Sequence, residues 1–532
     1  MSRPRELALR FLPWTAPLAL LPAFLGAIAT AASWPIVHDL PLMVYAGFLM
    51  NEHGLVPYRD FFEMNPPGTL YFYSAYHSLF GSDADAFRIV HLSWLAAVLA
   101  AVFLFLKRWS PAAGVVAAMC FVVAYVGTGR DSAFQREFLL TLPLAWSFVV
   151  AFPTAGVAGT RSLAWRAFAI GLLFGLAATI KPPAALGWPI VMVGFVLAHG
   201  DGTGLRRLLA ASAWRSAGWT GLGFALPLAA LASVLAAQNA LAPFLEMAAG
   251  YWPLYREVAG DGRVLGDGMA AFAAAQTVER VREFPYLAAA CLGVAATFTA
   301  RATSDPTRAA AVLMLFAQVL AWVFYLFYGG KTWYYHAQPL YLSLSLVTGL
   351  GVVFLVGDER RDLVRGGAAA AVFFILLALP IPRQSKPLDL ASIEEVAAYL
   401  VEHRSSEDRV LPIDVASGAL HAMLLAEAPV AGSFLYSFHF LHHTDTPYIQ
   451  ALREKQLAEL RSGRPRFVIR AVGGWQIQGD HGDARFAGLD DLLARHYRLL
   501  PLRNRGQLEL LERIGPSGPV GDGEPGSLGS GR

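Results

Sequence analysis

The sequence predicts an α-helical polytopic membrane protein of about eleven transmembrane helices, followed by a C-terminal extracytoplasmic α/β domain. Composition is the first observation behind this prediction. Apolar residues make up 56% of the 532 residues and charged residues 15%, against about 45–50% and 25% in an average soluble domain. Because one anchor needs only about 20 apolar residues, this excess requires many apolar segments. It excludes a disordered chain and argues against a soluble enzyme.

The second observation is that the apolar residues form eleven runs long enough, or nearly so, to cross a bilayer. The first run spans about 22 residues and exceeds the 7–15 apolar residues of a signal peptide, so we expect it to stay as a helix. The eleven runs cover residues 12–33, 86–106, 111–128, 138–153, 166–180, 184–199, 217–237, 284–300, 309–328, 336–356 and 364–382. An odd number places the two ends of the chain on opposite sides of the membrane.

The third observation is the distribution of Lys and Arg between the loops. If the N-terminus is cytoplasmic, the inner segments carry fifteen basic residues and the short outer loops carry four. This bias follows the positive-inside rule and supports both the orientation and the odd number of helices. The net charge of only +3 gives no basic surface for a nucleic acid, so we expect no nucleic-acid partner.

Two apolar stretches, Leu40 to Met50 and Gly68 to Phe80, are too short to cross a bilayer. Lengths of 10–14 residues are typical of interfacial or re-entrant segments. We therefore expect an outer loop over 34–85 with two helices that lie along the membrane surface. A second outer loop is expected over 238–283.

The chain changes character after residue 382, where amphipathic helices begin to alternate with strands. This alternation predicts an α/β domain over 383–514, after a transmembrane domain over 1–382. Helices are expected over 391–403, 417–426, 448–462 and 488–496, and strands over 409–414 and 465–472; two short apolar runs follow over 497–502 and 508–513. The last 18 residues contain 13 Gly, Pro or Ser, so 515–532 is expected to be a disordered tail.

Charged residues are almost absent from the apolar runs, where each would cost about 2.5–3.5 kcal/mol at a helix centre. They gather instead at the outer ends of the predicted helices. With two neighbouring tyrosines, the outer group consists of His38, Asp39, Glu52, His53, Arg59, Asp60, Glu63, Arg130, Asp131, Arg136, Glu137, Lys181, Lys331, Tyr334, Tyr335 and His336. Carboxylates and cations at one interface predict an active site that meets a lipid-borne anionic substrate from the outer side.

Several segments of this outer group carry a resemblance to a known family. They are Asp39, YRDFFEMNPPGTLYFYSAYHSLFG (58–81), FQREFLLTLP (134–143), TIKPPAAL (179–186) and GKTWYYHAQP (330–339). Together they resemble landmarks of C-type glycosyltransferases with the GT-C fold. Within that family they are similar to the bacterial branch related to protein O-mannosyltransferases and the lipid A aminoarabinose transferase. The resemblance covers most of residues 34–340 and none of the C-terminal domain.

The resemblance implies a hexosyl- or pentosyltransferase of the bacterial inner membrane. Such an enzyme takes a sugar from a polyprenyl-phosphate donor and transfers it, with inversion, to a hydroxyl of a cell-envelope glycan, lipid or protein on the outer face. Asp39 matches the family's catalytic Asp and would act as general base. The alternative is that Asp39 only caps the helix that begins at Leu40, because Asp is a preferred N-cap.

Glu137 matches the second outer carboxylate of the family and would orient Asp39, the acceptor or a metal. Alternatively, it pairs with Arg136 or Arg130 on an exposed loop. Lys331 and Lys181 would bind the donor phosphate, with Arg136 and Arg59 as further candidates. The alternative for the two lysines is that they extend to lipid headgroups.

One position departs from the aminoarabinose transferases, which have Lys directly before the Pro at the end of this loop. This chain has Asn65 there, so a cation is lost and the donor sugar is not predicted. Asp60 and Glu63 are candidates to hold the acceptor or a divalent cation, Mg or Mn, unless they are simply solvated loop carboxylates. No cofactor is certain. Tyr334, Tyr335 and His336 join Asp60, Glu63 and Asn65 as candidate substrate-binding residues.

Three histidines, His439, His442 and His443, have spacings that a zinc site could use, but no pattern of paired ligands surrounds them. We therefore predict no metal site there. Two other functions stay open. A transporter or flippase of lipid-linked sugars would predict internal repeats and broken helices, which the sequence does not show. A non-catalytic accessory protein would keep the fold and use the outer domain for binding.

Overall fold

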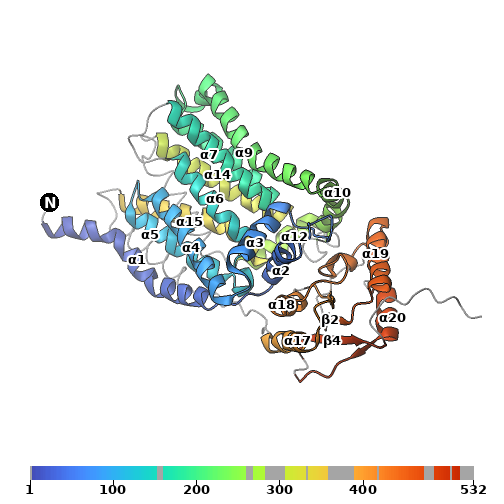
Figure 1. Cartoon of the computed structure of the whole chain (residues 1–532). Helices are drawn as coiled ribbons and strands as arrows, with labels where there is room; N and C mark the ends of the chain where they lie inside the picture. The colour runs from blue at the N-terminus through green and yellow to red at the C-terminus, as the bar shows by residue number, and fades with distance from the viewer. Residues whose placement is uncertain are drawn as a thin grey trace, which may run out of the picture.

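The computed structural model shows a bundle of long helices joined to a smaller α/β domain (Figure 1). It describes residues 3–152, 160–258, 268–281, 306–330, 333–357, 389–415, 418–472, 485–503 and 506–515. The predicted spans 284–300 and 364–382, the boundary at 382–383 and nearly all of the predicted tail lie outside the described residues.

The bundle consists of helices that coincide with the predicted apolar runs. They are α1 (Arg3–Ala32), α4 (Ala84–Leu106), α5 (Pro111–Gly127), α6 (Arg136–Ala151), α7 (Thr160–Ile180), α8 (Gly187–His199), α9 (Ala211–Ala237), α14 (Pro306–Tyr328) and α15 (Gln338–Gly357). Within the described ranges, five helical stretches are long and apolar enough to cross a membrane. The polytopic helical fold is therefore confirmed, and the total of eleven spans stays a prediction.

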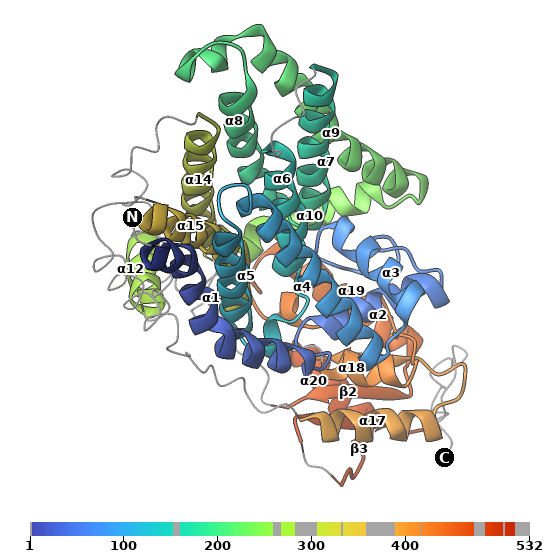
Figure 2. The same ribbon diagram turned by 90° about the vertical axis from the view of Figure 1, so that its left-hand side faces the viewer.

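The first predicted outer loop contains two helices, α2 (Leu40–Glu52) and α3 (Pro67–Phe80). All ten residues from Leu40 to Leu49 are buried, because α2 packs between α3 and α18 of the C-terminal domain (Figure 2). The Tyr45 hydroxyl donates to the carbonyl of Ala428 across this contact at 2.6 Å. Helix α2 is thus internal, which differs from the predicted helix along the membrane surface.

The C-terminal domain contains the four predicted helices and the two predicted strands in the predicted order, and the two short apolar runs after them contain two further strands. These are α17 (Leu390–His403), β1 (Val410–Ile413), α18 (Gly418–Leu425), α19 (Pro447–Gly463), β2 (Phe467–Ala471), α20 (Ala487–His496), β3 (Tyr497–Leu499) and β4 (Leu508–Arg513). The sheet has the order β1-β2-β4-β3, with β1 parallel to β2 and the other pairs antiparallel.

The two faces of this sheet contribute to different cores. Phe467 and Ile469 of β2 belong to the core that also contains α2 and the bundle, whereas Val468 packs in a second core with α19 and α20. The alternation follows from the two-residue period of a strand. One hydrophobic core therefore runs from the helix bundle into the C-terminal domain.

The described parts of the two predicted outer loops and of the C-terminal domain contact one another. Helix α10 (Leu241–Glu257) reaches the first outer loop, where the Trp252 indole donates to the carbonyl of Met64 at 2.9 Å. Tyr251 of the same helix lies 3.2 Å from the Nε2 atom of His442. This arrangement agrees with the predicted topology, although the placement of these segments on the outer side stays a prediction.

Glycines set the distance between helices α7 and α9. A Cβ atom at Gly171 or Gly175 of α7 would overlap main-chain oxygens of α9, and one at Gly223 of α9 would overlap the carbonyl oxygen of Phe168. Small residues permit such close packing of membrane helices. The spacing of Gly171 and Gly175 is a signal for this contact that is visible in the sequence.

We expect Gly223→Leu to destabilise the bundle, because its side chain cannot fit against α7; overpacking typically costs about 1–3 kcal/mol. Gly221→Leu on the same helix is the control, since a Cβ atom there meets nothing within 4 Å. Thermal unfolding in detergent, followed by tryptophan fluorescence, should show a lower midpoint for Gly223→Leu only. Equal midpoints for the two variants would contradict the close contact.

Candidate active site

Asp39 lies in a strained turn at the start of α2. The preceding residue, His38, has a φ of 60°, which is uncommon for a residue with a side chain and often marks a functional site. The Asp39 side chain makes no capping hydrogen bond with α2. Instead, its Oδ1 atom lies 3.1 Å from Nδ1 of His38 and its Oδ2 atom 3.5 Å from Nη2 of Arg136. The geometry therefore does not support the role of a simple helix cap.

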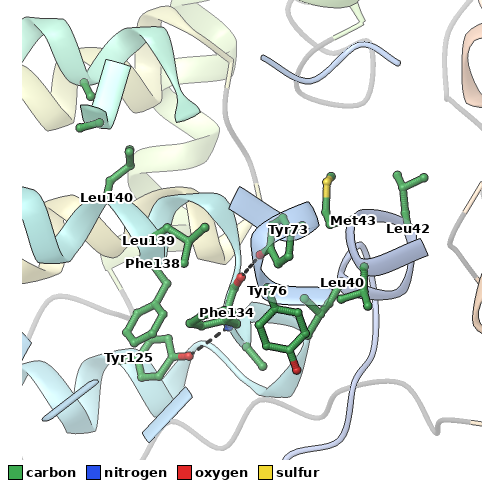
Figure 3. Packing of buried hydrophobic residues seen from close by; sticks show 14 of the residues in the cluster. Leu40, Leu42, Met43, Tyr73, Tyr76, Tyr125, Phe134, Phe138, Leu139 and Leu140 are labelled. Atoms are coloured by element: carbon green, nitrogen blue, oxygen red, sulfur yellow. Dashed lines mark hydrogen bonds between the residues drawn. The ribbon is translucent and has the colours of Figure 1, made fainter. Parts of the chain in front are cut away.

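A second strained turn positions the start of α6. Phe134 has a φ of 53° and is held by two tyrosines (Figure 3). The Tyr73 hydroxyl donates to the Phe134 carbonyl at 2.5 Å, and the Tyr125 hydroxyl accepts from the Phe134 amide at 3.4 Å. Arg136 and Glu137 follow this turn directly, so α3 and α5 together determine where these two side chains lie.

Glu137 is fully buried, with no exposed side-chain surface. Its Oε1 atom is in direct contact with the Nζ atom of Lys181 and lies 3.4 Å from both His336 Nε2 and the Tyr325 hydroxyl. A buried carboxylate needs such partners, because its desolvation is otherwise very costly. Glu137 is thus not part of an exposed loop pair, and Lys181 does not extend to headgroups.

The charges around Asp39 determine its protonation. Burial disfavours the charged form, but the charge and hydrogen bond of His38, and the charges of Arg136 and Lys181, outweigh it and lower the pKa of Asp39 to about 2. The pKa of His38 is raised, because Asp39 outweighs the opposing effect of burial. The Asp39 side chain is 23% exposed and that of Glu137 is 0% exposed. Asp39 is therefore an ionised carboxylate that a substrate can reach.

Glu63 and Asn65 form a buried unit within the first outer loop. The Oε1 atom of Glu63 accepts from the main-chain amide of Asn65 at 2.9 Å and from its side-chain amide at 2.6 Å. The Tyr436 hydroxyl of the C-terminal domain lies 3.3 Å from the same oxygen. Burial raises the pKa of Glu63 despite these hydrogen bonds. Asn65 thus has a structural partner within the loop, and Glu63 is not a solvated carboxylate.

The other predicted residues take different places. Arg59 pairs with Asp60 at 2.7 Å and donates to the carbonyl of Gln238 at 3.0 Å, so both residues fasten the loop to the end of α9. Tyr335 is buried, with its ring 5.7 Å from that of His38, and Tyr334 is 45% exposed. Lys331 lies outside the described residues.

Two partners of the site were missed by the sequence analysis. Tyr325 contacts Glu137 from α14, and its only signal was a position near the outer end of an apolar run. Tyr436 contacts Glu63 from a domain that carries no resemblance to the family, so the sequence offered no signal for it.

The residues of the site do not fit a divalent cation. Asp39 and Glu137 each have a cationic partner already, and no group of three His, Cys, Asp or Glu side chains in the described ranges could hold a metal ion. Of the three histidines in the C-terminal domain considered for zinc, His442 contacts protein atoms with both ring nitrogens. Its Nε2 atom lies 3.2 Å from the Tyr251 hydroxyl, and its Nδ1 atom lies 3.1 Å from the Phe438 carbonyl oxygen.

Comparison with known structures finds similar folds at low identity. The apo oligosaccharyltransferase of Archaeoglobus fulgidus is 11% identical, with a TM-score of 0.43 over 85% of this chain and 69% of that chain. The same enzyme in complex with Zn and sulfate is 13% identical, with a TM-score of 0.41 over 85% of this chain and 68% of that chain. ArnT from Cupriavidus metallidurans bound to undecaprenyl phosphate is 12% identical, with a TM-score of 0.41 over 94% of this chain and 99% of that chain.

Both proteins belong to the class that the sequence resembles. No protein-family model matches the sequence, and no curated protein matches it.

We expect Lys181→Met to destabilise the protein by about 3–5 kcal/mol, because it leaves the buried carboxylate of Glu137 without its closest cation. The double variant Glu137→Gln with Lys181→Met removes both charges and should recover most of the loss. Thermal unfolding of the purified protein in detergent measures both effects. A double variant no more stable than Lys181→Met would contradict a direct pair.

Proposed function

We propose that the protein is a glycosyltransferase of the bacterial inner membrane. It transfers a hexose or pentose from a polyprenyl-phosphate donor to a hydroxyl acceptor on the outer face, with inversion. The observation that carries the proposal is the convergence of four separate segments, which bring Asp39, Arg136, Glu137, Lys181 and His336 into one charged cluster. The N-terminus would be cytoplasmic and the C-terminal domain extracytoplasmic.

Asp39 would act as general base. The acceptor hydroxyl donates a hydrogen bond to its carboxylate and attacks the anomeric carbon on the face opposite the phosphate. A bond forms between the acceptor oxygen and this carbon while the bond from the carbon to the phosphate oxygen breaks. Because the hydroxyl proton becomes strongly acidic as the new bond forms, a carboxylate with a pKa of about 2 can accept it late in the step.

The leaving phosphate would be stabilised by cations. Arg136 lies 3.5 Å from Asp39, and its Nε atom is buried without a hydrogen-bond partner in the described structure. Negative charge that develops on the phosphate is stabilised by such pre-arranged cations. Lys181 adds positive charge behind Arg136, and Lys331 is proposed from the sequence alone. Arg59, which is paired with Asp60, is left out of this role.

The remaining residues would position the site. Glu137 has no exposed surface, so we assign it the role of holding Lys181 and His336 rather than touching a substrate. Glu63 and Asn65 shape the first outer loop, and Tyr436 joins that loop to the C-terminal domain. Tyr334, which is half-exposed, is proposed to contact the sugar or the prenyl chain, beside the buried ring of Tyr335.

We expect Asp39→Asn to lower transfer by about 10²- to 10⁴-fold, the usual contribution of a general base, without a loss of folded protein. Asp85→Asn is the control, because the Asp85 side chain is 82% exposed and pairs only with Arg88 on its own helix. Transfer is measured with a panel of radiolabelled polyprenyl-phosphate sugars. Retained turnover in Asp39→Asn would refute the mechanism.

The same panel separates the proposal from its rivals. A flippase would move the lipid-linked sugar across a vesicle membrane without cleaving it, and an accessory protein would bind it without turnover. Release of free polyprenyl phosphate in the wild type, and its loss in Asp39→Asn, is expected only for a transferase.

We further expect transfer to be unchanged by EDTA and by added Mg²⁺ or Mn²⁺, because the carboxylates of the site are already neutralised by Arg136 and Lys181. The measurement is the initial rate before and after chelation. A rate that falls with EDTA and returns with either ion would show that the cluster rearranges to admit a metal.

A further inference from the structure

A pocket in the C-terminal domain takes no part in the proposed transfer. It has a volume of about 410 Å³ and is lined by the ends of α19 and α20 together with β3 and β4, so it is built by this domain alone. Helices α19 and α20 lie on the side of the domain that faces away from α1 and α5 (Figure 1). The volume is within the range of small-molecule sites, about 300–1,000 Å³.

The walls of the pocket are held by regular structure. The Tyr497 hydroxyl donates to the Pro465 carbonyl at 2.7 Å, which fastens β3 to the end of α19. Tyr497 is also opposite Arg513 in the antiparallel pair of β3 and β4. Side chains placed by helices and strands define a site more sharply than side chains on loops.

The lining is strongly basic. Four arginines, Arg461, Arg464, Arg495 and Arg513, line the pocket together with His496, and Asp491 is the one carboxylate among the lining residues. Two helices, α19 and α20, end at the pocket, and a cation near a helix end is worth about 0.3–1 kcal/mol. Arg464 already serves the end of α19, since its Nε atom donates to the Arg461 carbonyl at 3.2 Å. Arg495 lies 3.5 Å from Asp491.

Arg461 and Arg513 remain without an ion-pair partner among the described residues. The Nη1 atom of Arg513 is buried and makes no hydrogen bond to any of them. A buried donor without an acceptor is costly, and anionic oxygens are the acceptors that a guanidinium binds best. A compact group with several negatively charged oxygens would supply the acceptors that these guanidinium groups bind best.

We propose that this pocket binds the phosphate or carboxylate group of a small anionic ligand. The group would lie between Arg461, Arg495 and Arg513 and accept hydrogen bonds from their guanidinium groups. Such a group can come from a free sugar or glycan or from a lipid headgroup. The proposal concerns binding only and does not depend on the transfer reaction.

The test is isothermal titration calorimetry on the full chain in detergent. Glucose 6-phosphate and glucuronate are expected to bind saturably, and glucose is not. In the double variant Arg461→Gln with Arg495→Gln, both residues being exposed helix positions, affinity should fall at least tenfold. Arg498→Gln is the matched control, because Arg498 is 66% exposed, pairs with Glu512 and does not line the pocket.

A water-soluble phosphatidylglycerol, dihexanoyl phosphatidylglycerol, tests the second source in the same way. Binding tighter than that of glucose 6-phosphate, and lost in the double variant, assigns the pocket to a lipid headgroup; the reverse order assigns it to a sugar. The absence of saturable binding for all three anions would overturn the proposal. So would an equal loss in Arg498→Gln and in the double variant, because the binding would then depend on surface charge alone.

Discussion

The burial of the Glu137 carboxylate is the constraint on which the site depends. A charge without contact with water is tolerated only where cations and donors surround it, and these come from Lys181 after α7, His336 before α15 and Tyr325 of α14. One end of each of the four helices α6, α7, α14 and α15 must therefore meet at one point. Because Arg136 precedes Glu137 directly, the same meeting brings a guanidinium to Asp39. The buried carboxylate of Glu137 organises the cluster, and Asp39 is the partly exposed carboxylate beside it.

The sequence was sufficient to predict the bundle helices that the structure describes before residue 358 and the mixture of helices and strands that it describes after residue 389. Apolar runs such as 86–106 have few alternatives to a membrane helix, and the alternation of strands and amphipathic helices after residue 389 is a local pattern. Asp39, Glu137 and Lys181 were identified from their positions at the predicted outer ends of helices, and the two carboxylates also from resemblance to a family. Their separation in the sequence did not indicate which residue pairs with which. These pairs depend on how helices pack, which a one-dimensional pattern does not contain.

The same limitation explains the position of α2. Its composition is that of a short apolar helix, and a helix of this kind was predicted to lie along the membrane surface. Its actual cover is α18, which lies almost four hundred residues further along the chain. Glu63 is a similar case, since its partner Tyr436 is 373 positions away. The sequence pattern of each of these segments predicts its own secondary structure. It does not predict which distant segment will pack against it.

The shared core of α2 and the C-terminal domain has a consequence for biogenesis. Residues around Tyr45 are synthesised early, whereas their cover around Ala428 is made 383 positions later. At about 5–20 residues per second, the apolar surface of α2 stays uncovered for roughly 20 to 80 seconds while the intervening helices are inserted. During this interval the membrane or a chaperone has to shield it. The packing of α2 is therefore completed only after the C-terminal domain has been made, although α2 itself is among the first segments synthesised.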